Sequence, residues 1–392
     1  MERNDPRYQA YVEILKEELI PAMGCTEPIA LAYAAAKARE VLGVLPDSVQ
    51  LQVSGSIIKN VKSVIVPNTG HLKGMEAAVA AGIIAGSAEK ELEVISEVSE
   101  EKKSAIRDYL QTVPITIEHT EQGHVFDIVV TERCGQDYAR VRIADYHTNI
   151  CRIEKNGTVL YEVPLLDETV QEDARADRSL LNMQDIWDFA ETADLRDVAD
   201  LLERQIRYNN AIAEEGLLGD YGANIGRVLL TTYGNDVSNR AKAKAAAGSD
   251  ARMNGCELPV IINSGSGNQG ITCSVPLIEY AKELHSGKEK LYRALIISNL
   301  VAIHEKTGIG TLSAYCGAVS AGAGAGAGIV YLCGDGYQAA IHTVVNALAI
   351  VSGIVCDGAK ASCAAKIASS VDAALLGYNM YKCNQEFKGG DG

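Results

Sequence analysis

The sequence predicts an α+β protein, in which a mainly helical domain of small-residue-rich helices carries an inserted, smaller α/β domain. Two observations favour this fold class. From Met183 onward nearly every segment has a helical pattern, and the helices become richer in Ala, Gly and Ser toward the carboxyl end. Between Ser48 and about Val163, short runs typical of strands replace that pattern. The 392 residues are enough for two or three domains of roughly 150 residues each.

The first elements are expected to be helices. Residues 7–20 carry an apolar helical stripe that runs into Pro21, where a break is expected. The stretch 29–43 contains strong helix formers, follows Pro28 in the first turn and stops at Gly43. Because this Ala-rich stretch has the same small-residue composition as the late helices, we predict that it packs among them.

The middle of the chain is expected to form a sheet. Connections after Pro114 are too short for parallel crossovers, so the sheet should be mostly antiparallel. Two helical pieces, 75–86 and 101–111, interrupt the strands. The runs that we predict as strands are 49–57, 63–67, 115–119, 125–132, 138–145, 148–154 and 158–163.

With the sheet inserted, the helical domain is discontinuous in sequence. The acidic stretch 165–179 is expected to be a surface linker after the last strand. The predicted boundaries are 1–45 and 170–392 for the helical domain, and 46–169 for the α/β domain.

The carboxyl-terminal third contains a long uncharged region. No residue from Thr307 to Gly334 is formally charged, and its length raises the question of a membrane span of about 20 residues. The region is rich in Gly, Ala and Ser instead of Leu and has no basic flank, so we predict no membrane association. The alternation AGAGAGAG at 321–328 indicates a close-packed helix or turn.

Composition excludes some partners. The net charge is −15, the sequence pI is near 5.0, and no Lys/Arg cluster forms a basic stripe, which argues against nucleic acid. The charged first twenty residues lack the apolar stretch of a signal peptide. We therefore expect a cytoplasmic protein whose ten cysteines are reduced.

Three late cysteines, Cys316, Cys356 and Cys363, are the candidate metal ligands, and the last two belong to the string CDGAKASC. Thiolates are soft ligands that favour iron–sulfur clusters or zinc, and a cluster held by three of them keeps one iron open. We expect Cys356 to end one helix and Cys363 to open the next, with Ser362 as its cap. Two buried structural cysteines are the alternative for the last pair.

Longer strings resemble a known family. PAMGCTEP at 21–28, NSGSGNQGITCSVP at 263–276 and CDGAKASC at 356–363 are similar to those of the bacterial and archaeal L-cysteine desulfidases, relatives of the iron–sulfur L-serine dehydratases. The resemblance runs along essentially the whole chain. It implies a 4Fe-4S cluster held by Cys316, Cys356 and Cys363 in the helical domain, which would be catalytic. The dehydratase pair is spaced more widely than Cys356 and Cys363.

Two residues are candidates for proton transfer. Cys25 lies at a predicted helix start, which should lower its pKa below the free value near 8.5. The resemblance favours a functional role for Cys25, either as a general base or as a cluster ligand before substrate arrives. His147 has a pKa near neutrality and is the other candidate base, with a structural histidine as the alternative.

The glycine-rich loop 264–270 is the predicted clamp for a substrate carboxylate. It offers backbone N–H groups and polar side chains that are costly to bury without a ligand. Cys273 follows the loop and could line the same pocket. The loop candidates are Ser264, Ser266, Asn268 and Gln269.

Two further loops, 54–60 and 66–74, follow strand-like runs and supply secondary candidates. Surface turns with solvated lysines are the alternative for both. Their substrate-binding candidates are Ser54, Lys59, Asn60, Asn68 and Lys73, with His71 beside them.

By resemblance, the reaction is α,β-elimination from L-cysteine to sulfide, ammonia and pyruvate, with the substrate thiolate on the open iron. L-serine deamination with the same cluster is the near alternative. A pyridoxal-phosphate lyase using Lys59, and a non-catalytic cluster sensor or amino-acid-binding protein, are the others. The expected partner is a small amino acid, and a homodimer is the default assembly.

Overall fold

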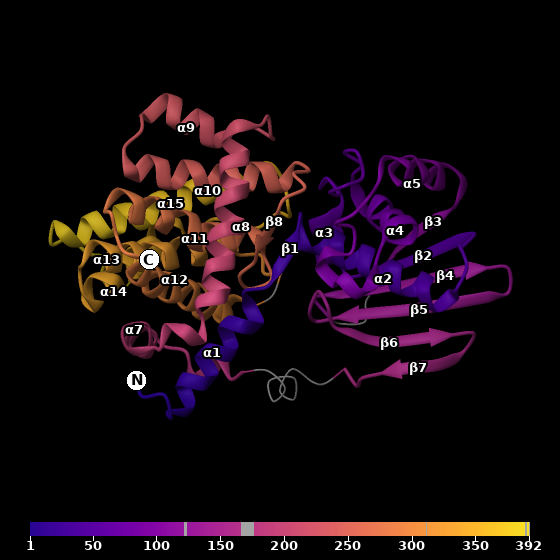
Figure 1. Cartoon of the computed structure of the whole chain (residues 1–392), viewed down its shortest axis with the longest axis horizontal. Coiled ribbons are helices and arrows are strands. Elements are labelled where there is room, and N and C mark those ends of the chain that lie inside the picture. The colour runs from indigo at the N-terminus through magenta and orange to yellow at the C-terminus, as the bar shows by residue number, and fades with distance from the viewer. Residues whose placement is uncertain (121–123, 166–175, 311, 389, 392) are drawn as a thin grey trace.

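The structure is a computed structural model, and it describes residues 1–120, 124–165, 176–310, 312–388 and 390–391. Figure 1 shows two parts side by side: helices on one side, which we call the helical part, and a sheet with its covering helices on the other, which we call the sheet part. The predicted α+β class, mainly helical, is confirmed.

The sheet part is a six-stranded sheet in the order β3-β2-β4-β5-β6-β7. Strands β2 and β3 pair in parallel, and the other described neighbours pair antiparallel, so the predicted mostly antiparallel sheet is confirmed. The strands are β2 (Ser48–Val53), β3 (Ile115–His119), β4 (Asp127–Cys134), β5 (Asp137–Ala144), β6 (Ile150–Lys155) and β7 (Thr158–Glu162).

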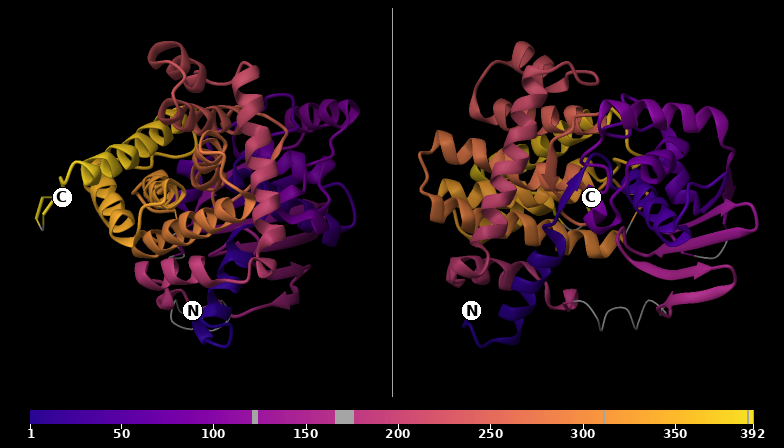
Figure 2. Two further views of the ribbon diagram at one scale, coloured as in Figure 1. Left: turned by 60° about the vertical axis from the view of Figure 1, so that its left-hand side comes forward. Right: turned by 45° about the vertical axis from the view of Figure 1, so that its right-hand side comes forward.

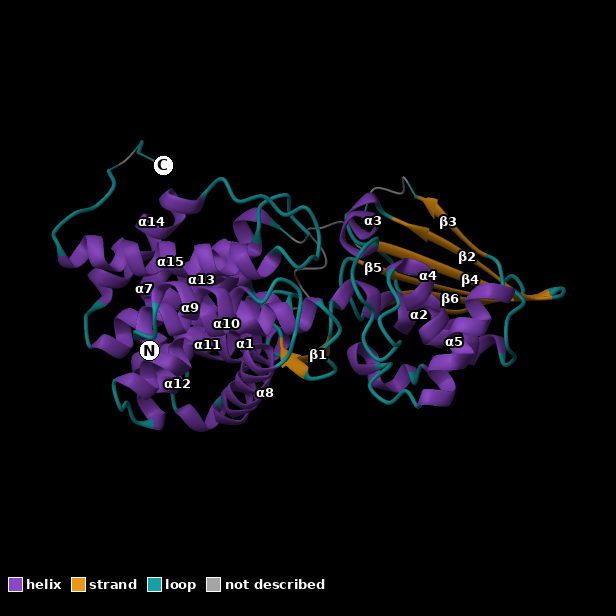
Figure 3. Cartoon of the chain, turned by 90° about the horizontal axis from the view of Figure 1, so that it is seen from above, coloured by secondary structure: helices purple, strands orange, loops and turns teal. Residues whose placement is uncertain are grey.

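One face of this sheet is covered by helices, as Figure 3 shows. Their short apolar side chains allow close approach: a Cβ on Gly82 would lie only 2.1 Å from the carbonyl oxygen of Ala32. The helical elements of this part are α2 (Thr26–Leu42), α3 (Gly55–Val61), α4 (Gly74–Ala85), η1 (Ala88–Glu93) and α5 (Glu100–Thr112).

Three expectations for this part are wrong. Helix α2 packs on α4, β4 and β5, not among the late helices, because its Ala face fits the glycine of α4. The run 49–57 does not remain extended, since the carbonyl oxygen of Ser54 accepts from the N–H groups of Ile57 and Ile58 and begins α3. The run 63–67 forms one isolated bridge instead of a strand. The contacts of α2 favour grouping it with the sheet, and the domain boundaries stay a prediction.

The helical part confirms the helical pattern from Met183 onward (Figure 2). One short strand interrupts it, β8 (Pro259–Ile261), which pairs antiparallel with β1 (Pro21–Met23). The helices are α7 (Met183–Thr192), α8 (Ala199–Leu218), α9 (Ile225–Tyr233), α10 (Val237–Met253), α11 (Gly267–Glu283), α12 (Lys288–Ile309), α13 (Gly317–Cys333), α14 (Tyr337–Val351) and α15 (Cys363–Lys382), with η3 (Arg178–Leu180) and η4 (Leu195–Asp197).

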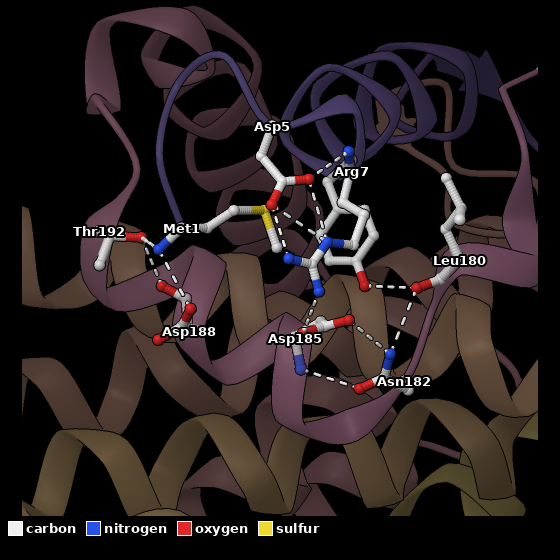
Figure 4. Close-up of polar contacts among 9 residues, drawn as sticks. Met1, Asp5, Arg7, Leu180, Asn182, Asp185, Asp188 and Thr192 are labelled. Carbon is white, nitrogen blue, oxygen red and sulfur yellow. Dashed lines mark hydrogen bonds and ion pairs between the residues drawn. The ribbon is translucent and has the colours of Figure 1, made fainter.

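The amino-terminal helix α1 (Pro6–Glu18) belongs to the helical part, as Figure 4 shows. Arg7 binds both Asp5 and Asp185, and the terminal amine of Met1 binds Asp188. Most of the predicted acidic linker, residues 166–175, lies outside the described residues.

Helix α13 contains the AGAGAGAG segment and packs against α11, α12, α14 and α15. Its glycines face different neighbours: a Cβ on Gly322 would lie 2.8 Å from Ser370 of α15, and one on Gly324 would lie 2.4 Å from the carbonyl oxygen of Ser298 of α12. The prediction of a close-packed helix is confirmed. Among the described residues, no helix is long and apolar enough to cross a membrane.

Gly324→Ala is expected to destabilise the protein by about 1–3 kcal/mol, because the new methyl group would overlap a backbone carbonyl that cannot turn away. Chemical denaturation measures this change. The matched control is Gly308→Ala in α12, where a Cβ meets nothing within 4 Å. It should be neutral or stabilising by up to about 1 kcal/mol. Equal effects of the two variants would contradict close packing at α13.

Glu132 in β4 makes a second prediction about stability. The residue is fully buried, neither carboxyl oxygen has a hydrogen-bond partner among the described residues, and burial raises its pKa well above the usual value. In the unfolded chain the group ionises near 4.5. Between these two pKa values the folded state holds a proton that the unfolded state releases, so stability falls by about 1.4 kcal/mol per pH unit as the pH rises.

Glu132→Gln removes this pH dependence. Denaturation at about pH 5 should give similar stabilities for variant and parent, and at about pH 8 the variant should be the more stable. Glu101→Gln, at an exposed position of α5, is the control and should change neither value. If the parent protein instead became more stable between about pH 5 and pH 8, relative to Glu132→Gln, the raised pKa of Glu132 would be refuted.

Candidate functional site

The site lies at the junction of the two parts, where the loop that carries Cys356 lies against the backbone of α3 at Lys59. Two backbone segments hold Cys316 and Cys356 side by side. The N–H of Cys356 donates to the carbonyl oxygen of Ala314 at 2.6 Å, and the N–H of Cys316 donates to that of Ile354 at 3.1 Å. Cys316 directly precedes α13, and Cys363 is the first residue of α15.

The three thiols interact electrostatically with one another. Burial raises the pKa of Cys316, and Cys356 and Cys363 raise it further. Burial likewise raises the pKa of Cys363, to which Cys356 adds. The structure therefore brings these three predicted ligands into one neighbourhood, although 40 and 7 positions separate them in the sequence.

Two details of this arrangement differ from expectation. Helix α14 ends at Val351, so Cys356 lies in the following loop and not at a helix end. Ser362 precedes α15 but forms no side-chain cap, since its backbone is already helical. Gly358 in this loop has φ +104, and a Cβ there would lie 2.4 Å from the carbonyl oxygen of Lys59. The thiol-bearing loop is therefore braced against α3 of the sheet part.

Cationic side chains surround the thiols. The ammonium group of Lys59 lies 3.5 Å from the carbonyl oxygen of Cys356. Burial lowers the pKa of Lys306, while Cys356 and Cys316 act to raise it. Lys366 binds Asp357 and also faces Cys316 and Cys363. Such charges favour bound thiolates or another anionic group.

Cys25 faces Glu27 beside this set. Its thiol donates to the Glu27 carboxylate at 2.9 Å, and the amide of Asn60 donates to the other carboxylate oxygen at 2.8 Å. Burial acts to raise the pKa of Glu27, but His147 and the hydrogen bond from Cys25 lower it, and the net pKa lies below the usual range.

The predicted low pKa of Cys25 is wrong. Cys25 does stand at the amino end of α2, where a helix dipole favours the thiolate. Burial nevertheless raises its pKa well above the usual value, and the charge of Glu27 raises it further. Loss of solvent and a facing carboxylate outweigh the dipole, so Cys25 is a thiol that donates a hydrogen bond.

His147 is buried between the two parts. Burial lowers its pKa below the usual value of 6.5, and its Nε2 has no hydrogen-bond partner among the described residues. The ring packs edge-on against Phe126 with centroids 4.7 Å apart. Its other neighbour is Gly265 of the glycine-rich loop, where a Cβ would lie 3.1 Å from the ring.

The glycine-rich loop contributes two side-chain oxygens without partners. Oδ1 of Asn268 and Oε1 of Gln269 are buried and accept no hydrogen bond from the described residues. The Gln269 side chain reaches the start of α13, since a Cβ on Gly317 would lie 2.5 Å from its amide carbon. Ser264 donates to Asn263 at 2.9 Å, and Ser266 precedes α11 without capping it. Two of the four loop candidates thus have buried acceptors without partners among the described residues, and one of them, Gln269, lies at the start of α13.

The remaining candidates are exposed or make contacts that hold loops and helices together. Asn68 donates to the carbonyl oxygen of Ile95 at 2.8 Å, and Ser54 donates to that of Val125 at 2.7 Å, which ties loops of the sheet part together. Lys73 is exposed at the start of α4. Cys273 packs against Ala302 and Ala321 between helices, and burial raises its pKa to about 12. None of these contacts reaches the thiols or His147.

Four site residues escaped the sequence analysis: Glu27, Lys306, Lys366 and Arg252, whose charge acts on Cys363 and on His147. Glu27 was part of the GCTEP string, and an acid followed by nine uncharged residues in the first turns of a helix was the available signal. Arg252 and Lys306 stand in the last turns of helices α10 and α12, a position that surface residues also occupy. Their burial is visible only in three dimensions.

The residues present fit an iron–sulfur cluster. Three soft thiol donors converge beside cationic groups and unpartnered polar atoms, and thiolates select such clusters. Within the described part of the chain, no three His, Cys, Asp or Glu side chains close around a single metal-ion position. A cluster with several irons takes its thiolates farther apart than one ion does.

Fold and site together define an α+β protein with a thiol-rich site at the junction of its two parts. A sequence model described as serine dehydratase alpha chain matches residues 89–390. The chain belongs to this family, which makes it a lyase of the dehydratase type, and such enzymes typically depend on iron–sulfur. Cys25 and α3 precede the matched residues.

Relatives match the whole chain. A UPF0597 protein of Desulfitobacterium hafniense is 62% identical over 392 residues, covering 100% of this chain and 91% of its own length. Similar UPF0597 proteins of Lachnoclostridium phytofermentans and Treponema denticola are 53% and 47% identical, covering 98% and 100% of this chain and 92% of each relative.

Single substitutions of Cys316, Cys356 or Cys363 by Ser are expected to remove most of the iron and acid-labile sulfide from anaerobically purified protein, because each removes one of three soft ligands. Metal analysis and visible absorption measure the loss. Cys383→Ser, at an exposed position outside the site, is the matched control and should keep full iron content. Retention of the cluster in all three site variants would refute this ligand set.

Proposed function

We propose that the protein is an iron–sulfur lyase that catalyses α,β-elimination of L-cysteine to sulfide, ammonia and pyruvate. The observation that carries the proposal is the convergence of three thiols of the helical part, together with Arg252, whose charge acts both on Cys363 and on the buried His147 of the sheet part. Family membership supports the lyase class.

Cys316, Cys356 and Cys363 would hold a 4Fe-4S cluster. When bound, such a cluster supplies an open iron that acts as a Lewis acid and withdraws charge from the leaving atom. Lys306 and Lys366 lie close enough to the thiols to offset negative charge there. These two lysines therefore place positive charge at the end of the site that would hold the leaving group.

His147 is the better candidate for the general base. Burial keeps its imidazole neutral near pH 7, and the free Nε2 is an atom that can take the α-proton. Cys25 is less suited, since its thiol donates to Glu27 and holds its proton to high pH. We assign Cys25 to the support of Glu27, whose carboxylate in turn faces His147.

L-serine is the second candidate substrate, and the description of the matching family favours it. A soft thiolate prefers iron more strongly than a hydroxyl does, which favours cysteine. A lysine Schiff base to pyridoxal phosphate is disfavoured because Lys59 faces a backbone carbonyl beside the thiols. A sensor without turnover is disfavoured by membership of a lyase family.

Reconstituted protein under anaerobic conditions should release sulfide and pyruvate from L-cysteine, with a higher kcat/KM than for pyruvate release from L-serine. Sulfide trapping and a lactate dehydrogenase-coupled assay measure the two products. A higher kcat/KM for serine would instead make the protein a serine dehydratase. Cluster-containing protein that turns over neither amino acid would refute the proposed function.

The pH profile separates the two candidate bases. With His147 as base, kcat/KM should be flat above pH 6.5 and fall only at lower pH, because burial lowers its pKa and protonation removes the base. With Cys25 as base, activity would keep rising beyond its usual pKa of 9.0. His147→Gln should lower kcat by about 10²–10⁴-fold with unchanged iron content, and Cys25→Ser should have a smaller effect.

A further inference from the structure

We propose that Arg252 binds the α-carboxylate of the amino-acid substrate. This assignment rests on the proposed function and names a ligand-binding residue that the sequence motifs do not contain. It follows from the burial of the side chain, from the residues around it and from the lack of an anionic partner.

Arg252 lies near the end of α10 and is only 3% exposed. Its Nε has no hydrogen-bond partner, and the described residues form no ion pair with its guanidinium. Two other partly buried arginines of the chain are paired: Arg142 binds Asp127, and Arg178 binds Glu17 and Glu18. A buried unpaired charge is costly, so an anion from outside the chain is the expected partner.

The guanidinium lies directly on the glycine-rich loop. A Cβ on Gly267 would lie 2.3 Å from its Nε and 2.8 Å from its central carbon, so only glycine leaves room for it. Loop backbone and guanidinium thus border the same space. Arginine presents its N–H groups in a planar fork that matches a carboxylate.

Arg252 also interacts with reactive groups from both parts of the molecule. Its charge acts on Cys25, Glu27 and His147 at one end of the site and on Cys363 at the other. A substrate held by its carboxylate at Arg252 therefore has the proposed base and the thiol set within its reach. A small amino acid spans such a site with its α-proton and its β-substituent.

Glu27 does not take the place of the ligand. Its two carboxylate oxygens accept from Cys25, Thr26 and Asn60, and it forms no hydrogen bond with Arg252. The carboxylate on which Arg252 acts is thus already satisfied by neutral donors. This leaves the guanidinium available for an incoming carboxylate.

L-alanine is the probe for a direct test, because it has the carboxylate and amine of the substrate but no leaving group. Its binding is measured by calorimetry on cluster-containing and cluster-free full-length protein. Ethylamine, which lacks only the carboxylate, should bind neither form. Arg252→Gln should weaken L-alanine binding about 10- to 100-fold, and Arg252→Lys should weaken it less. Arg204→Gln, which removes another arginine with an unpartnered Nε, is the matched control.

In steady-state assays Arg252→Gln should raise KM for L-cysteine more than it lowers kcat, with iron content unchanged. Loss of iron with normal L-alanine binding would instead assign Arg252 to the thiol set and overturn the proposal. Equal binding of ethylamine and L-alanine to the parent would also overturn it, even where a variant fails to fold. L-alanine binding through Arg252 without any turnover would refute only the proposed function.

Discussion

The packing of α13 against α15 is the constraint on which the thiol set depends. Gly322 of α13 meets Ser370 of α15, and one turn later Gly326 meets Ala374. The offset is the same in both pairs, so the two helices run parallel and their amino ends lie together. Those ends carry Cys316 and Cys363. Each glycine removes a methyl group that would push the helices apart, and small residues far from the sulfur atoms thereby set the distance between the sulfur atoms.

Burial is the second influence on the site, and it acts in opposite directions on its two candidate bases. It raises the pKa of Cys25 and lowers that of His147, so both groups are held neutral at physiological pH. Only the imidazole is a base in its neutral form. The same loss of water leaves Arg252, Asn268 and Gln269 with unpartnered atoms, a cost that a bound ligand with matching polar groups would remove. These unpartnered atoms therefore favour the binding of a polar ligand in the site.

Periodicity and motifs predicted the helical class, most strands and the three thiols, because each has a local signature. They failed where the packing or the pKa of a residue depends on the residues that it contacts in the fold. Residues 29–43 have the same small-residue composition as the late helices, yet they pack on α4, where Gly82 allows the backbone of Ala32 to approach closely. The pKa of Cys25 was predicted from its helix position, whereas its facing carboxylate and burial decide it. Arg252 had no signature at all, since one arginine near a helix end reads as a solvated charge until its neighbours are known.

The two parts of the chain supply different chemistry to one site. In the proposed reaction, the helical part would bring the thiols and Arg252 to the leaving group and the carboxylate, and the sheet part would bring His147 and the Cys25–Glu27 pair to the proton. Gly358 joins the halves, since its lack of a side chain lets the thiol loop lie on the backbone of Lys59. Proton removal and departure of the β-substituent must occur on one bound molecule. A shift of one part against the other would therefore separate the base from the leaving group without changing any residue that performs either step.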